Sequence, residues 1–93
     1  MTREIIVQIL EGEGAEGRAG TYKIPEAREA TCFVSNPGDL FAIPRVTRIE
    51  LKDNYIAIST TKDERFSFAY EDVLGFRLAA PATAKERSAG FAR

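Results

Sequence analysis

Apolar and polar residues alternate most regularly between residues 46 and 70, and this alternation predicts three consecutive antiparallel strands. A two-residue primed turn at Asp53-Asn54 and a three-residue loop over residues 61–63 bring the apolar positions of these strands into register. A four-residue second loop would turn the two apolar sets to opposite faces of the sheet. The chosen loops pair Leu51 with Ile56, Ile49 with Ile58, Ile58 with Phe66 and Ile56 with Phe68, so all six side chains are expected to be buried on one side.

Shorter apolar runs predict further strands before residue 46. Residues 3–10, REIIVQIL, are apolar on both faces, which is typical of a central strand. Residues 21–24 and residues 31–35 are expected to form two more short strands. The N-terminal half of the chain therefore resembles the C-terminal half in its preference for β-structure.

Turn residues separate these runs. Residues 25–30, PEAREA, are compatible with one helical turn that has Pro25 at its first position. Residues 36–39, NPGD, carry Pro and Gly at the second and third positions of a type II turn. Residues 71–78 predict a tight or helical turn and then a last strand. The expected fold is mainly β: a single small antiparallel β-barrel or strongly bent meander of about six to seven strands, with at most one or two short helical turns.

Two segments lack a regular pattern. Residues 11–20, EGEGAEGRAG, hold four Gly and three Glu and are expected to form a mobile loop. Gly12, Gly14 and Gly17 formally match the dinucleotide-binding spacing G-x-G-x-x-G, but a strand-like segment follows where that site requires a helix. Residues 79–93 are rich in Ala and charge and are expected to be a disordered basic tail. We thus expect one small domain over residues 1–78.

The composition excludes much of the common chemistry of active sites. The 93 residues contain no His and a single cysteine, Cys32, which removes Cys/His zinc sites, histidine-based nucleophilic dyads and disulfides within the chain. Asp53, Asp63 and Asp72 are expected to serve as turn residues rather than acid/base groups. We therefore expect no catalysis, no cofactor and no metal. A buried Cys32 and the absence of a long apolar run favour a cytoplasmic protein without a membrane partner.

Charge is distributed unevenly along the chain. Residues 1–78 carry ten Lys or Arg against thirteen Asp or Glu, whereas residues 79–93 carry three against one. A protein that binds nucleic acid by neutralising phosphates normally has a basic body. The acidic body therefore argues against that class, although a local basic patch remains compatible with it.

The outward face of the three strands is the candidate binding surface. It has small residues at its centre and Arg, Lys and Tyr at its rim, a combination that suits an interface. The candidate binding residues are Arg48, Lys52, Tyr55, Ala57, Ser59, Arg65 and Ser67. The preferred function is a non-catalytic protein-interaction, adaptor or self-association module whose partner is another protein or itself. The alternative is a nucleic-acid-binding regulatory domain using this face and Arg45, to which Glu50 in the middle of the patch is the main objection.

Residues 43–68, IPRVTRIELKDNYIAISTTKDERFSF, are similar to the opening strands of LytTR-type DNA-binding domains. They are about equally similar to pleckstrin-homology-like and Sm-like barrels. None of these families has a diagnostic motif in the run, so the residues assign no family.

Overall fold

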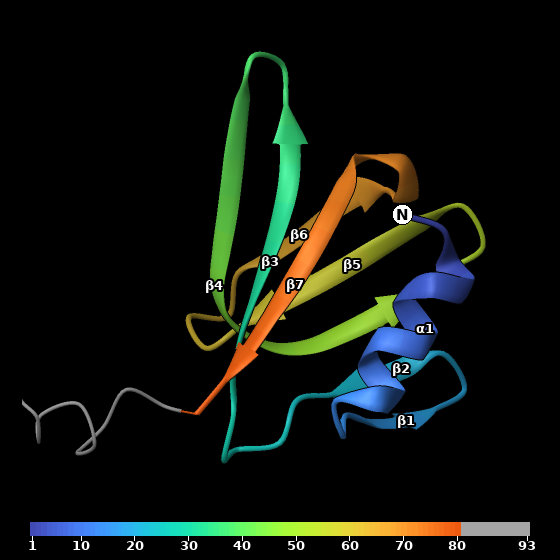
Figure 1. Cartoon of the computed structure of the whole chain (residues 1–93), viewed down its shortest axis with the longest axis vertical. Helices are drawn as coiled ribbons and strands as arrows, with labels where there is room; N and C mark the ends of the chain where they lie inside the picture. Colours follow the sequence, from blue (N-terminus) through green and yellow to red (C-terminus); the bar gives the residue numbers. More distant parts are fainter. Residues whose placement is uncertain (81–93) are drawn as a thin grey trace, which may run out of the picture.

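The computed structural model describes residues 1–80, which form a curled, mainly β structure with one α-helix (Figure 1). Seven strands, the helix and a short 3-10 turn make up this part of the chain. In chain order the elements are α1 (Arg3–Gly12), β1 (Glu16–Arg18), β2 (Thr21–Lys23), β3 (Glu29–Asn36), β4 (Asp39–Leu51), β5 (Tyr55–Thr60), β6 (Arg65–Ala69), η1 (Tyr70–Asp72) and β7 (Val73–Ala79). The expected fold class is confirmed: one antiparallel sheet of seven strands curls into a half-barrel.

Strand β4 shapes the half-barrel because it belongs to both halves of the sheet. Its first part pairs with β3, and its last part pairs with β2 on one side and β5 on the other. The pairings with β3 and β5 both shift register next to Val46, and Arg45 has a φ of +56°. Bulges of this kind bend a strand sharply. The bend turns β3 and β7 across β5 and β6, as Figure 1 shows.

The register predicted for β4, β5 and β6 is confirmed. Leu51 pairs with Ile56, Ile49 with Ile58, Ile58 with Phe66, and Ile56 with Phe68. Asp63 closes the three-residue loop with a φ of +62°, and the Thr60 amide donates to the Glu64 carbonyl. The predicted type of the preceding turn is wrong, because neither Asp53 nor Asn54 adopts the positive φ that a primed turn requires.

Residues 3–10 form a helix, so the strand predicted there is wrong. The Thr2 hydroxyl caps the helix by accepting a hydrogen bond from the Ile5 amide at 3.2 Å, and Glu4 lies in the first turn, where a negative charge is favourable. Ile6 and Leu10 are four residues apart and both point into the core. The β-branched run therefore satisfies a helical period as well as a strand period, and burial of this face in the half-barrel selects the helix.

The expected loop over residues 11–20 is also corrected in part. Gly12 ends α1, and β1 pairs with β2 through a turn at Ala19 and Gly20, both of which have positive φ. A side chain at Gly17 would collide with the ring of Tyr22, so the glycine lets the two strands pack closely. The helix ends at Gly12, the first of the three glycines, which places a helix C-terminus rather than an N-terminus beside them, so the structure supplies no phosphate cradle there.

The remaining turns and the end of the chain largely follow the prediction. Gly38 has a φ of +78° in the two-residue turn between β3 and β4, as a type II turn requires. The helical turn predicted over residues 25–30 is wrong: residues 25–28 form a single β-turn closed by the Arg28 amide and the Pro25 carbonyl, and β3 begins at Glu29. Strand β7 extends to Ala79, one residue into the predicted tail, and residues 81–93 lie outside the described part.

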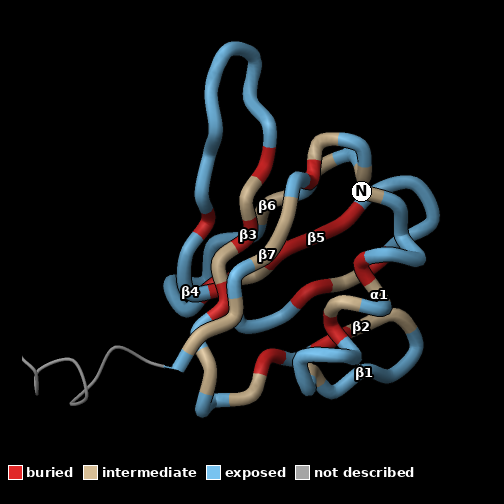
Figure 2. The backbone as a smooth tube through the Cα atoms, in the orientation of Figure 1, coloured by how far each residue is buried: buried red, intermediate tan, exposed pale blue. Residues whose placement is uncertain are grey.

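The core lies on the concave side of the half-barrel, beneath α1 (Figure 2). Ile6 and Leu10 pack there with Ile49, Ile56 and Ile58 from the sheet. Phe66 and Phe68 were expected to be buried with these residues but are only partly buried. They lie at the open side of the half-barrel, where β6 has no second neighbouring strand among the described residues.

Candidate functional site

The face predicted as a binding surface has the expected strand pairing but a different chemical character. Arg48, Ser59 and Arg65 form one row across β4, β5 and β6. Glu50, Ala57 and Ser67 form the next row, and Tyr55 pairs with Ala69 beyond it.

The glutamate in the middle of this face binds all three cations around it. One carboxylate of Glu50 lies 2.7 Å from Arg65, 3.5 Å from Arg48 and 3.6 Å from Lys52, measured between charged atoms. The hydrogen bond from Arg65 is the main cause that lowers the pKa of Glu50, and the positive charges of Arg65, Lys52 and Arg48 act in the same direction. The rim of basic residues is therefore drawn together around one carboxylate.

The ion-pair cluster changes what this face offers to a partner. Ala57, which pairs with Glu50, is only 1% exposed. The flat centre expected from the sequence therefore offers little contact area at Ala57, while Tyr55 remains exposed at one end. Binding by this face stays a prediction, and its cations are already paired.

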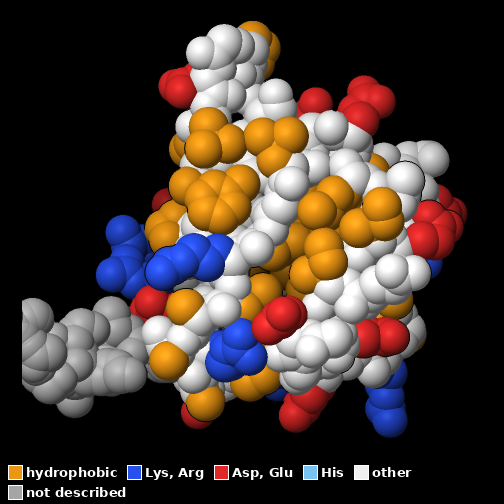
Figure 3. Space-filling model, in the orientation of Figure 1, with side chains coloured by type: hydrophobic (Ala, Val, Ile, Leu, Met, Phe, Trp, Pro, Cys, Tyr) orange, Lys and Arg blue, Asp and Glu red, His pale blue; other side chains and the backbone are white. Residues whose placement is uncertain are grey.

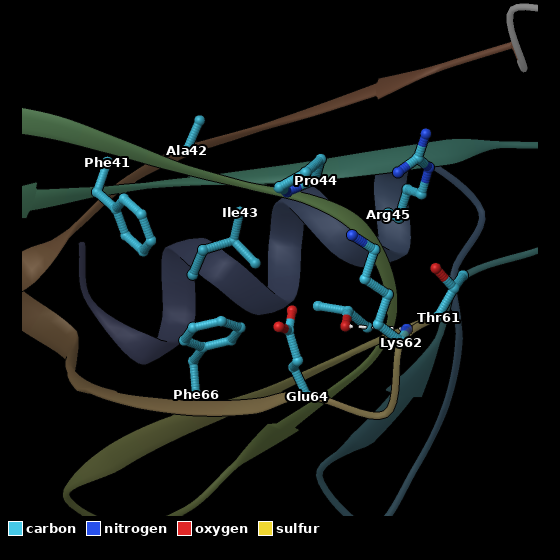
Figure 4. A pocket seen from close by; sticks show the side chains of 10 residues that line it. Phe41, Ala42, Ile43, Pro44, Arg45, Thr61, Lys62, Glu64 and Phe66 are labelled. Atoms are coloured by element: carbon cyan, nitrogen blue, oxygen red, sulfur yellow. Dashed lines mark hydrogen bonds between the residues drawn. The ribbon is translucent and has the colours of Figure 1, made fainter.

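A second surface, not predicted from the sequence, opens between β4 and the β5–β6 hairpin (Figure 4). It is a groove of about 290 Å³ that we call the aromatic groove. Figure 4 shows Phe41 and Ile43 pointing from β4 toward Phe66 on β6. The residues that line the groove are Phe41, Ala42, Ile43, Pro44, Arg45, Thr60, Thr61, Lys62, Glu64 and Phe66.

Aromatic contacts shape the floor of the groove. The rings of Phe41 and Phe66 meet edge to face with their centroids 6.3 Å apart, and Phe66 stacks on Phe68 at 6.3 Å. Phe41 remains 43% exposed. An aromatic pair that is held in a fixed geometry and still faces solvent can receive an apolar side chain without first being ordered.

The groove is closed at one end and charged at its rim. The Thr61 amide donates to the Arg45 carbonyl at 3.1 Å, which joins β4 to the loop that follows β5. Lys62 and Glu64 lie on the hairpin side of the opening (Figure 4). The groove therefore combines an apolar floor with a rim that carries both signs of charge.

One wall of the groove is a strand edge that offers few hydrogen bonds. In the ladder with β3, the backbone groups of Leu40, Ala42 and Pro44 point away from β3. The Leu40 amide donates instead to the Asp39 side chain at 2.8 Å, and Pro44 has no amide hydrogen. The Ala42 amide is thus the donor that this stretch presents to a strand arriving from outside.

The sequence contained a weak signal for the groove. Residues 40–43, LFAI, are an unbroken apolar run directly after a turn, whereas a strand with one solvated face alternates. The run shows that both faces of β4 carry apolar side chains. It does not show that Phe66 lies opposite Phe41, because that contact depends on the bend of β4.

Within residues 1–80, no three His, Cys, Asp or Glu side chains are grouped in a way that could hold a metal ion. The helix found in that range is too short and too polar to cross a membrane.

Comparisons with protein-family models, with curated proteins and with solved structures find no match for this chain.

Proposed function

We propose that this protein is a non-catalytic interaction module whose aromatic groove binds an apolar side chain from an extended segment of another protein. The observation that supports the proposal is the exposed Phe41 ring, held against Phe66 beside an open strand edge. An extended segment that runs along β4 would turn alternate side chains toward this pair. We also propose a cytoplasmic location, which is supported by the reduced, buried Cys32.

The size of the groove limits the strength of this interaction. Its 290 Å³ suits one large side chain or two small ones. Burial of one large apolar side chain contributes about 1.5 to 3 kcal/mol, and the Ala42 amide adds about one backbone hydrogen bond. The interaction expected from the groove alone is weak and transient, in the manner of a module that recognises short segments.

The nucleic-acid alternative has less support from the described surface. Arg48, Lys52 and Arg65 would have to leave Glu50 before they could contact phosphates. Breaking these pairs opposes the gain from releasing counterions. A protein partner requires no such rearrangement at the aromatic groove.

The proposal is tested with peptides selected from a random library displayed on phage. Peptides enriched on the wild-type protein are expected to contain a large apolar residue, and their affinities are measured by isothermal titration calorimetry. Phe41→Asp places a charge on the groove floor and should weaken binding at least about tenfold. Leu40→Asp is the matched control, because Leu40 is the next residue of β4 and points to the opposite face.

Three outcomes would contradict the proposal. One is equal affinity of selected peptides for wild-type protein and the Phe41→Asp variant. Another is a set of peptide-induced amide shifts that avoids Phe41, Ile43 and Phe66 in an NMR titration. Equal loss of binding in the Phe41 and Leu40 variants would likewise show that the groove is not the site.

A further inference from the structure

A second apolar surface covers the convex side of β3, β4 and β7, opposite the core. Cys32 and Val34 of β3 are buried, so Phe33 between them points outward. Phe33 pairs with Ala42 on β4 and with Gly75 on β7, which places all three on this convex side. Figure 4 agrees, since Ala42 points away from the groove that Phe41 and Ile43 enter.

This surface, which we call the outer face, is more exposed and more apolar than a solvated sheet face normally is. Leu40 at one end is 55% exposed, and Leu74, the extra residue of a bulge in β7, is 51% exposed. Figure 3 shows hydrophobic side chains gathered over β3 and β4. The outer face consists of Phe33, Leu40, Ala42, Leu74 and Gly75.

Charged residues border both ends of the outer face. Arg77 lies at one end, where it pairs with Thr31, and the exposed Glu29 lies two residues before Thr31 on the same side of β3. Glu71 and Asp72 lie at the other end, in the 3-10 turn just before β7, and Asp39 lies beside the hairpin turn.

We propose that the outer face binds a second copy of this chain in a two-fold dimer. A two-fold axis that crosses the strands places β7 against β7 of the second copy, running in the opposite direction. Arg77 of each copy then approaches Glu71 and Asp72 of the other, while Phe33 covers apolar surface at the centre and Leu40 does so at one end. The positive charge of Arg77 at one end and the negative charges of Glu71 and Asp72 at the other are complementary to each other in this arrangement.

The packing of the chain supports an intermolecular contact here. The inner side of β3 already packs in the core through Cys32 and Val34. A register change that buried Phe33 would expose these two side chains, so Phe33 stays on the outer side. Two twisted sheets pack face to face at about 10 Å when their facing side chains are apolar and small or flat, as Ala42 and Gly75 allow. The dimer does not depend on the proposed peptide groove, which lies on the opposite face of β4.

Gly75 permits a test that does not disturb the fold of one chain. A side chain at Gly75 would meet nothing within 4 Å, and its φ is not in the left-handed region. Gly75→Arg should therefore leave the single chain folded while it places a bulky cation in the centre of the dimer contact. Gly12→Arg is the matched control, because Gly12 has equally open space and lies on α1.

The mass of each protein is measured by sedimentation equilibrium from about 10 µM to about 1 mM, a range in which mass action reveals a weak dimer. The wild-type protein and Gly12→Arg are expected to change from one chain to two with rising concentration. Gly75→Arg should remain a single chain throughout. Circular dichroism of the two variants verifies that both retain the fold.

Charge exchange tests the orientation of the two copies. Arg77→Glu should weaken the dimer about tenfold, because two ion pairs become two repulsions. The double variant Arg77→Glu, Glu71→Arg should recover most of this loss. A wild-type protein that remains a single chain at the highest concentration, or Gly75→Arg that dimerises like Gly12→Arg, would overturn the dimer. Failure of the double variant to recover affinity would overturn the two-fold arrangement.

Discussion

At the scale of single residues, Glu50 is the group whose ionisation most affects the predicted binding face. Folding lowers the pKa of Glu50, first through its hydrogen bond from Arg65 and then through the neighbouring positive charges. A carboxyl group with a lowered pKa stabilises the folded state above its unfolded pKa. This stabilisation is lost as the pH falls through the lowered folded value.

We therefore predict that Glu50→Gln reduces the loss of stability in acid. The measurement is the urea midpoint of unfolding at several pH values between about 2 and 6, the range in which carboxyl groups titrate. The wild-type midpoint should fall more steeply toward low pH than that of the variant. Glu26→Gln is the control, because Glu26 is exposed and lies outside the described ion pairs. Equal slopes for Glu50→Gln and wild-type protein would contradict the prediction.

The same residue shows how far the candidate site could be predicted. Strand spacing placed Glu50 among Arg48, Lys52 and Arg65, because register depends on backbone geometry alone. The convergence of the three cations on one carboxylate depends on side-chain conformations, which spacing does not determine. The sequence therefore predicted a patch of mixed charge, and the structure shows three cations that share one carboxylate.

At the scale of elements, α1 shows where pattern reading fails. Residues 5–10, IIVQIL, place apolar side chains on both faces of a strand and also at helical spacing. Whether the segment forms a helix or a strand depends on the half-barrel, whose apolar core side is buried by α1. The half-barrel is in turn formed by the remaining strands. Local hairpins were predicted because their partners are close in sequence, whereas the pairings of β2 with β4 and of β3 with β7 are not local.

Two neighbouring isoleucines test the role of α1 as the cover of the core. Ile6 is fully buried, whereas Ile5 is 46% exposed. Ile6→Ala should lower the free energy of unfolding by about 2 to 5 kcal/mol, because it removes packed methyl groups and leaves a cavity. Ile5→Ala has the same effect on helix propensity but should change stability by no more than about 0.5 kcal/mol. Urea unfolding followed by circular dichroism measures both values, and similar losses in the two variants would show that α1 does not pack as described.

At the scale of the whole molecule, the bend of β4 produces both proposed surfaces. Phe41 and Leu40 are adjacent, yet one lies in the aromatic groove and the other on the outer face. A flat sheet would have left Phe66 far from Phe41. The open side of the half-barrel and the convex apolar face therefore have one structural cause, which no single segment of the sequence reveals.

The buried thiol provides a test of whether the described fold unfolds as one unit. Cys32 lies on β3 between Ile43 of β4 and Phe76 of β7, and it is fully buried. Burial raises the pKa of Cys32 to about 12, so the folded thiol stays protonated at a pH where an exposed thiol begins to ionise. A thiol reagent can reach it only after β3 separates from a neighbouring strand.

We predict that Cys32 reacts with an aromatic disulfide reagent only through unfolding of the whole structure. For a stability of about 5 kcal/mol, the native reaction should be roughly several thousandfold slower than that of an exposed thiol, because only the unfolded fraction reacts. Its rate should rise with urea as steeply as the equilibrium unfolding constant, and Ile6→Ala should accelerate it by the same factor by which it raises that constant. The control is Asn36→Cys in a Cys32→Ala background, which places an exposed thiol at the end of the same strand. Labelling of Cys32 at a rate independent of urea would show that β7 or β4 opens locally, and the fold would then consist of more than one unfolding unit.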